Sequence, residues 1–287
     1  MVTNLSARGG QVKISAHLIT WGPDWELGMK QLAGLGFGAC ETFTHVALEY
    51  EDKVEDFQEI LAGSGLRLSA LYGGGQFTNP DVAETVIAHN ARVARFLAAN
   101  GVDRIVFGPG GPRQDGGTTR EGLVQAAKTM GEAGRRCLDV GVKACLHPHL
   151  FTEIETRDEL DFIMEHTDPE VIGFTPDTAH LTAAGMDAAE VIRTYADRLD
   201  YVHVKDLRPG FDRAMGFKVE SGGEQLPIFC ELGLGTIDLP RIFDTLVDIG
   251  YAGWVTVEID QSTTTPEQSL RICRDYLQDE LHQSLTP

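Results

Sequence analysis

The sequence of 287 residues is short of basic side chains, and this scarcity limits the partners that it can have. It contains 24 Lys and Arg against 43 Asp and Glu, which gives a formal net charge of −19. Proteins that bind nucleic acids or anionic membrane surfaces do so through clusters of cationic side chains. Neither partner is therefore expected, and an acidic, well-solvated surface is the simpler interpretation.

Cysteine is also scarce, and no two cysteines form a C-x-x-C pair. The first 13 residues contain no apolar core of a secretory signal. No apolar run approaches the roughly 20 residues that a membrane helix needs. These absences predict a cytoplasmic protein with buried, free thiols. The five cysteines are Cys40, Cys137, Cys145, Cys230 and Cys273.

Strand-like and helix-like patterns alternate along the chain. Strands are predicted at residues 12–19, 38–43, 66–72, 103–107, 142–146, 171–175, 201–204 and 254–259. Helices are predicted at residues 25–35, 54–62, 81–99, 118–140, 157–166, 188–198, 240–249 and 266–278. Eight such units indicate an α/β protein with one (β/α)₈ TIM barrel spanning residues 1–287. An open doubly wound sheet is the alternative, but no G-x-G-x-x-G follows the first strand.

Residues 206–235 interrupt this alternation. They are rich in glycine and charge and show little periodicity. A long connection of this kind in a compact domain is often a lid over a site. We therefore expect this segment to cover the mouth of the barrel.

Polar side chains gather where three of the predicted strands end. Asp177 and His180 follow the sixth strand, His203 and Lys205 end the seventh, and Glu258 ends the eighth. Taken singly, Asp177 fits a helix cap and His203 fits a buried core histidine. In a barrel, however, all strand ends face one mouth. Imidazole and carboxylate ligands there predict one divalent metal ion, with Mn²⁺ the first expectation and Co²⁺, Mg²⁺, Fe²⁺ or Zn²⁺ as alternatives.

The fifth strand ends in a pair of histidines, His147 and His149, with Glu153 in the loop that follows. Each of the three is a candidate base for removing a proton beside a carbonyl group. Lys205 and Arg208 are candidates for holding substrate oxygens or stabilising an oxyanion. Side chains expected to line the mouth and bind substrate hydroxyls are His180, Glu41 and His17, with a structural role as the alternative for Glu41 and His17.

Several of these motifs resemble the xylose-isomerase-like TIM-barrel superfamily of sugar isomerases, epimerases and dehydratases. The resemblance covers nearly the whole chain and is carried by D-T-A-H at 177–180, H-V-K-D at 203–206 and V-E-I-D at 257–260. Within that group, H-P-H-L-F-T-E-I-E-T at 147–156 and C-E-L-G-L-G-T-I-D-L at 230–239 resemble the inosose (2-keto-myo-inositol) dehydratases.

The resemblance implies one divalent ion held by Asp177, His203, Glu258 and a glutamate from the loop after the fifth strand. The epimerases place a glutamate where this chain has His147-Pro148-His149. Glu155 is therefore the expected fourth ligand, and the two histidines are expected to transfer protons. A ligand role for one of the histidines remains an open alternative.

The function implied by this resemblance is that of a metal-dependent lyase, which dehydrates a cyclic keto-polyol through an enolate. A sugar isomerase or epimerase, and a β-eliminase of keto-glycosides, are alternatives that share the enolate. A DNA-repair endonuclease on this barrel needs a basic surface, which the net charge of −19 disfavours. A non-catalytic binding barrel is the last alternative, and the loss of one ligand would support it. The partner is a small sugar or cyclitol, and a homo-oligomer is compatible with the sequence.

Overall fold

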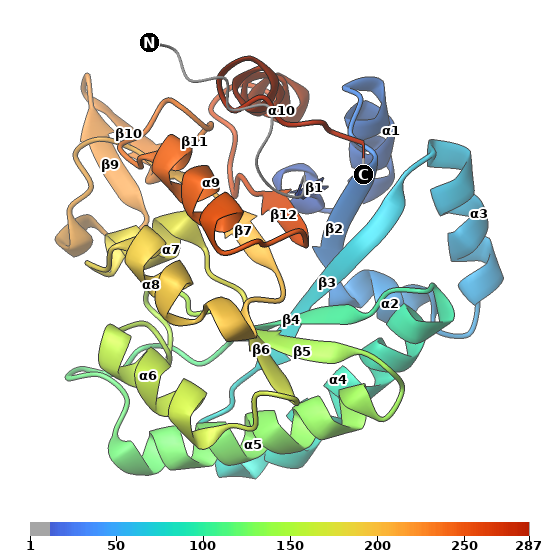
Figure 1. Ribbon diagram of the computed structural model, residues 1–287, viewed down its shortest axis with the longest axis vertical. Helices are drawn as coiled ribbons and strands as arrows, with labels where there is room; N and C mark the ends of the chain where they lie inside the picture. Colours follow the sequence, from blue (N-terminus) through green and yellow to red (C-terminus); the bar gives the residue numbers. More distant parts are fainter. Residues whose placement is uncertain (1–11, 287) are drawn as a thin grey trace.

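The computed structural model describes residues 12–286, and its centre is a ring of eight parallel strands (Figure 1). Neighbouring strands follow the order β6-β5-β4-β3-β2-β1-β12-β7. The first and last of these strands also meet, because Asp177 and His203 form a parallel bridge in which His203 N donates to Pro176 O at 2.9 Å. The (β/α)₈ TIM barrel predicted from the sequence is confirmed. The strands are β1 (Lys13–His17), β2 (Ala39–Phe43), β3 (Arg67–Gly75), β4 (Arg104–Pro109), β5 (Lys143–Leu146), β6 (Ile172–Phe174), β7 (Val202–Val204) and β12 (Trp254–Val257).

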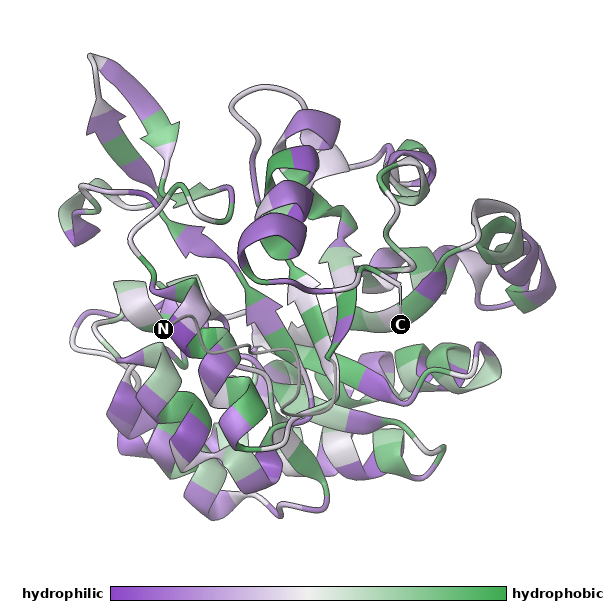
Figure 2. Cartoon of the chain, turned by 45° about the horizontal axis from the view of Figure 1, so that its top comes forward, coloured by the Kyte–Doolittle hydropathy of each residue, from purple (hydrophilic) through white to green (hydrophobic). Residues whose placement is uncertain are grey.

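Helices surround the ring and bury one face each against it. Helix α9, for example, buries Leu239, Ile242, Phe243 and Leu246, whose spacing of three and four residues places them on one face. Figure 2 shows the resulting hydrophilic and hydrophobic bands on the helices. The helices are α1 (Trp25–Gly34), α2 (Thr44–Tyr50), α3 (Val54–Ser64), α4 (Ala83–Ala99), α5 (Arg120–Leu138), α6 (Arg157–His166), α7 (Thr178–Ala183), α8 (Ala188–Thr194), α9 (Leu239–Asp248) and α10 (Pro266–Asp275).

The segment 206–235 is more ordered than its sequence pattern indicated. It forms two small antiparallel sheets, β8 (Asp206–Leu207) with β11 (Phe229–Cys230) and β9 (Lys218–Ser221) with β10 (Glu224–Pro227). The hairpin of β9 and β10 projects from the barrel at the upper left of Figure 1. Both ends of the segment are tied to Asp206, whose carboxylate accepts hydrogen bonds from the backbone N–H groups of Leu207, Gly233, Gly235 and Ile237 at 2.9–3.1 Å.

The interior of the barrel is unusually polar. Four buried hydroxyl groups form a continuous hydrogen-bonded chain, from Ser15 to Ser69 at 2.7 Å, from Ser69 to Tyr201 at 2.7 Å and from Tyr201 to Thr256 at 2.6 Å. Side chains two residues apart on a strand point the same way. The hydroxyl layer therefore lies one step before a layer of ionisable groups at the carboxyl ends of the strands, formed by His17, His203 and Glu258.

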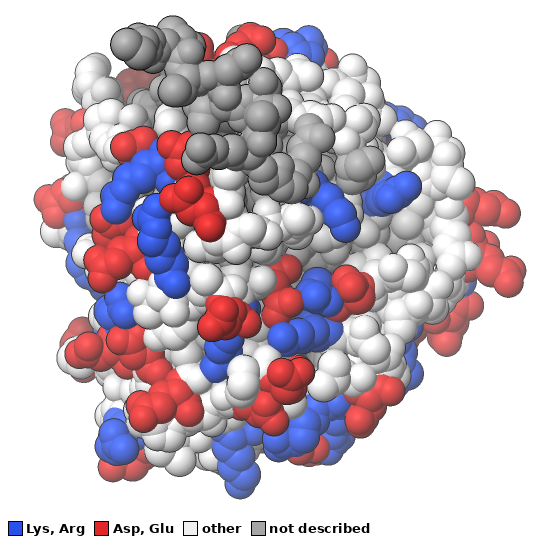
Figure 3. All heavy atoms as spheres, in the orientation of Figure 1, with Lys and Arg blue, Asp and Glu red and all other residues white. Residues whose placement is uncertain are grey.

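The five cysteines are buried and free, as predicted. Among residues 12–286, no helix combines the length and the apolar character that a membrane span requires. Acidic and basic side chains are interspersed over the face drawn in Figure 3.

Candidate metal centre

Four buried polar side chains converge at the carboxyl ends of β5, β6, β7 and β12. His147 directly follows β5, Asp177 follows β6, His203 belongs to β7 and Glu258 directly follows β12. Each offers one ligand atom, and these atoms all lie within 4.8 Å of one another. We call these four residues the four-group cluster.

The cluster contains polar atoms that the protein itself does not satisfy. His147 Nε2, Asp177 Oδ2, His203 Nδ1 and Glu258 Oε2 are buried without a hydrogen-bond partner. Burying such atoms unpaired is costly, so an unpaired group calls for a missing partner. His203 Nδ1 and Glu258 Oε2 even approach to 2.8 Å without hydrogen-bond geometry. Two imidazoles and two carboxylates directed at one point fit a divalent metal ion.

The local structure at Asp177 explains why only one of its two carboxylate oxygens has hydrogen-bond partners. Asp177 is the N-cap of α7, and its Oδ1 accepts hydrogen bonds from Ala179 N and His180 N, both at 2.8 Å. Burial works against the ionised form, but Lys205 and the neighbouring histidines hold the pKa of Asp177 well below its usual range. The residue is therefore both a helix cap and a charged group of the cluster.

Glu41 orients His203 from behind. His203 Nε2 lies 2.8 Å from Glu41 Oε2, so this nitrogen donates and Nδ1 turns toward the other cluster groups. Burial opposes the charged ring, but Glu41 and Glu258 raise the pKa of His203 to about 10. His17 Nε2 lies 3.8 Å from the second oxygen of Glu41, and its Nδ1 accepts from Ile19 N at 2.9 Å. Glu41 and His17 are both buried, and their contacts lie within the protein.

Lys205 lies beside the cluster as a buried cation. Its Nζ is 2.7 Å from Asp260 Oδ1, 3.0 Å from Glu258 Oε1 and 3.7 Å from Asp177 Oδ2. It also lies 4.5 Å from the centre of the Phe229 ring, which belongs to β11 of the segment 206–235. Burial works against the charge of Lys205, but these carboxylates raise its pKa well above the usual value.

His149 and His180 form the other wall, with ring centroids 3.8 Å apart. His149 Nδ1 lies 2.8 Å from Leu150 O, so Nδ1 carries the proton and Nε2 keeps its lone pair. Burial, together with the nearby His147 and Lys205, lowers the pKa of His149 to about 4. His180 Nδ1 accepts from Leu150 N at 3.3 Å, and its Nε2 lies 3.5 Å from Lys205 Nζ. The wall thus offers the unprotonated Nε2 of His149.

Glu155, the fourth ligand expected from the sequence, lies outside the four-group cluster, which includes His147. The buried carboxylate of Glu155 pairs with Arg113 Nε at 3.2 Å and with the guanidinium group of Arg213. It also accepts from Phe151 N at 3.0 Å. Arg113 and Arg213 come from other loops, so the sequence pattern around Glu155 could not reveal these partners.

Two other expected residues also have structural partners. Glu153, a candidate base, accepts hydrogen bonds from Phe77 N at 2.7 Å and Thr78 N at 3.2 Å, and thereby holds the loop after β3. Arg208 Nε donates to Pro227 O at 2.8 Å within the segment 206–235. Neither is among the residues that form the cluster.

Two residues beside the cluster, Tyr72 and Asp260, were not expected from the sequence. The Tyr72 ring meets the His147 ring edge to face with centroids 5.4 Å apart, and it stacks near His203. Asp260 contacts Lys205, as described above. Its place in V-E-I-D, two residues after Glu258, was the available signal, because that spacing favours the same face.

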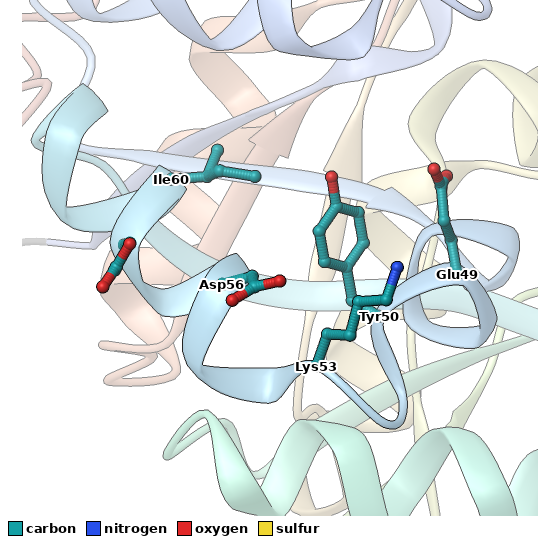
Figure 4. Close-up of a pocket in the computed structure, with 6 residues that line it drawn as sticks. Glu49, Tyr50, Lys53, Asp56 and Ile60 are labelled. Carbon is teal, nitrogen blue, oxygen red and sulfur yellow. The ribbon is translucent and has the colours of Figure 1, made fainter.

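The outer surface carries a separate hollow between α2 and α3 (Figure 4). Its lining includes the carboxylates of Glu49, Asp56 and Glu59 and the ammonium group of Lys53. None of the cluster residues lines it. The hollow is therefore separate from the barrel mouth.

Comparison with known proteins agrees with this geometry. The sequence model of the xylose isomerase-like TIM barrel family matches residues 29–278. The chain is similar to the inosose dehydratase of Clostridium tetani, with 32% identity over 165 residues that cover 56% of this chain and 55% of that relative. This match therefore spans about half the length of the relative. The inosose dehydratase of Geobacillus thermodenitrificans is 27% identical over 271 residues, which cover 88% of each protein.

A crystal structure of the IolI protein with a binding zinc atom has the same fold. Its TM-score is 0.75 at 19% identity, and the superposition covers 93% of this chain and 97% of that one. The family match over most of the chain, together with the closed barrel, identifies the architecture. The chain belongs to the xylose isomerase-like TIM barrel family.

Proposed function

We propose that His147, Asp177, His203 and Glu258 together hold one divalent metal ion. The convergence of their ligand atoms within 4.8 Å and the unpartnered state of those atoms support this assignment. Two imidazoles and two carboxylates suit Mn²⁺, Fe²⁺, Co²⁺ or Zn²⁺, and Mn²⁺ is our first expectation. His147 replaces Glu155 as the fourth ligand in this proposal.

The reaction that we propose is the dehydration of a cyclic keto-polyol of the inosose type. A divalent ion at the cluster supplies Lewis acidity, which stabilises negative charge on the substrate's keto oxygen. His149 Nε2 accepts the α proton, since its Nδ1–H is committed to Leu150 O. The electron pair of the C–H bond forms an enolate, which then expels the β hydroxyl as the β carbon–oxygen bond breaks. The protonated His149 ring gives its proton to that hydroxyl, which leaves as water, and Lys205 donates a hydrogen bond to a substrate oxygen.

The single observation that carries this proposal is the free Nε2 of His149 beside the cluster. Its Nδ1–H is committed to Leu150 O, so Nε2 presents the lone pair that removal of an α proton requires. His149 is partly exposed, so a substrate can reach it. The inosose dehydratase names of the relatives agree with this chemistry.

The charge balance of the mouth favours an uncharged substrate. Four carboxylates, those of Glu41, Asp177, Glu258 and Asp260, surround the cluster and Lys205. They outweigh the charges of Lys205 and of one dication together. A phosphate or carboxylate substrate would need a surplus of positive charge, so a neutral polyol fits better than a sugar phosphate or a keto acid.

We further propose that the segment 206–235 acts as a lid over this mouth. Phe217 lies 6.3 Å from the ring of His149, and Phe229 lies 4.9 Å from the ring of His180. Both phenylalanines belong to the segment, so it already lies against the proposed base and the ring beside it. A lid that excludes water protects an enolate from side reactions.

Mass spectrometry of products tests the reaction. The Mn²⁺-loaded protein is incubated with 2-keto-myo-inositol and, separately, with a panel of uncharged ketoses. Loss of one water from the cyclic ketone is expected, and His149→Gln should abolish it. His166→Gln, on the outer face of α6 and stacked on Phe162, is the matched control and should retain activity. Unchanged mass with a new ketose or aldose would assign the protein to the isomerases, which share the first step.

A further inference from the structure

Lys205 places a buried positive charge next to the four-group cluster, which is itself suited to bind a metal cation. Its side chain is only 1% exposed, and it contacts two carboxylates of the four-group cluster, Glu258 at 3.0 Å and Asp177 at 3.7 Å. These are two of the groups proposed to neutralise a dication. A lysine and a metal ion would therefore draw on the same two negative charges.

Asp260 is the carboxylate that can resolve this competition. Its Oδ1 lies 2.7 Å from Lys205 Nζ, the shortest of the lysine's three carboxylate contacts. Asp260 is outside the four-group cluster, so a metal ion does not claim its charge. Its side chain is 28% exposed and lies just beyond the end of β12, two residues after Glu258.

The position of Asp260 also fixes the direction of the lysine. Of its carboxylate partners, Glu258 and Asp177 lie toward the cluster, whereas Asp260 is the partner with access to solvent. A buried cation that loses its partner is strongly destabilised. Without Asp260, the ammonium group would depend on Glu258 and Asp177 alone.

We propose that Asp260 is a positioning residue that lets Lys205 and a divalent ion occupy adjacent places in the mouth. It holds the ammonium group and offsets its charge, so that Glu258 and Asp177 remain available as ligands. This inference rests on the proposed metal site. In this role Asp260, the last residue of V-E-I-D, acts through its contact with Lys205, and acidic residues elsewhere on the surface cannot replace it.

The dependence on Lys205 gives the inference a sharp signature. If Asp260 acts through the lysine, removing its charge weakens metal binding only while the lysine is present. If Asp260 merely adds negative potential near a dication, its removal weakens metal binding whether or not the lysine is there. A double-mutant cycle separates the two cases.

The test measures Mn²⁺ binding to the full chain by isothermal titration calorimetry. The proteins are wild type, Asp260→Asn, Lys205→Met and the double variant. Asp279→Asn, which removes one exposed carboxylate from the closing segment of the chain, is the charge-matched control. We expect Asp260→Asn to raise the Kd about tenfold or more, in the range typical of residues that support metal ligands. Lys205→Met and the double variant should have equal Kd values, neither weaker than wild type.

An equal loss of affinity from Asp260→Asn in both backgrounds would overturn the inference. If Asp260→Asn alone does not fold, the double variant and Lys205→Met decide the matter. Equal Kd values for these two support the inference, and a tenfold weaker Kd for the double variant refutes it. A wild-type protein that binds no Mn²⁺ refutes the proposed metal site itself and the inference with it, whereas normal wild-type binding without coupling refutes the inference alone.

Discussion

Metal binding to the four-group cluster is expected to release one proton from His203. Burial opposes its charge, but Glu41 and Glu258 raise the pKa of His203 to about 10. Each ring nitrogen lies 2.8 Å from a carboxylate oxygen, and the two negative charges favour the charged ring. A metal ligand must be an unprotonated nitrogen. The ion must therefore displace the proton from Nδ1, which faces Glu258.

The size of this competition follows from the pKa. About two and a half pH units separate a pKa near 10 from pH 7.5, so the proton lowers the apparent metal affinity there by roughly two to three orders of magnitude. The association constant should then rise about tenfold for each pH unit up to about pH 9. An imidazole with the ordinary pKa of about 6.5 is only about a tenth protonated at pH 7.5. A whole proton released above that pH must therefore come from a group whose pKa is raised.

Calorimetry in buffers of different ionisation enthalpy counts the protons released. At about pH 8.5, where a pKa near 10 leaves the ring almost fully protonated, we expect close to one proton per Mn²⁺ bound. Lys205→Met should release the same number, which assigns the proton to His203 and not to the lysine. Glu41→Gln removes the carboxylate that raises the pKa, so it should release clearly less. Proton release near zero in the wild type would refute the reasoning.

Three further predictions concern other parts of the site. Glu155→Gln should lower the free energy of unfolding by roughly 2–4 kcal/mol in urea titrations, because it removes a buried charge that pairs with two arginines. The same variant should leave the Mn²⁺ Kd unchanged, whereas His147→Gln should raise that Kd at least tenfold. The opposite pattern would return the ligand role to Glu155. Asp206→Asn should cost about 1–3 kcal/mol of stability by the same assay, since one carboxylate accepts four backbone N–H groups. Finally, the pKa of His203 is raised on folding. The stability that its ion pairs contribute is therefore fully present below about pH 6.5 and is lost as the pH rises toward 10. The Tm of the chelator-treated wild type, followed by circular dichroism, should fall over that pH range more steeply than the Tm of Glu41→Gln.

The sequence by itself determined the architecture and three of the four cluster residues. Alternating strand and helix patterns define eight β–α units, and the order of such units leaves little choice of topology. Three cluster residues could be predicted because each lies where a buried strand ends, and the local sequence pattern marks that place. They are Asp177, His203 and Glu258.

Only the tertiary structure decided the fourth member of the cluster and the residues that support it. Whether Glu155 or His147 faces the centre depends on where Arg113 and Arg213 lie, and both come from loops distant in sequence. The contact of Asp260 with Lys205 likewise joins two different strand ends. Local patterns record which backbone conformation a segment adopts. The pairing of charges is set by which segments meet across the mouth, and that is a property of the closed barrel.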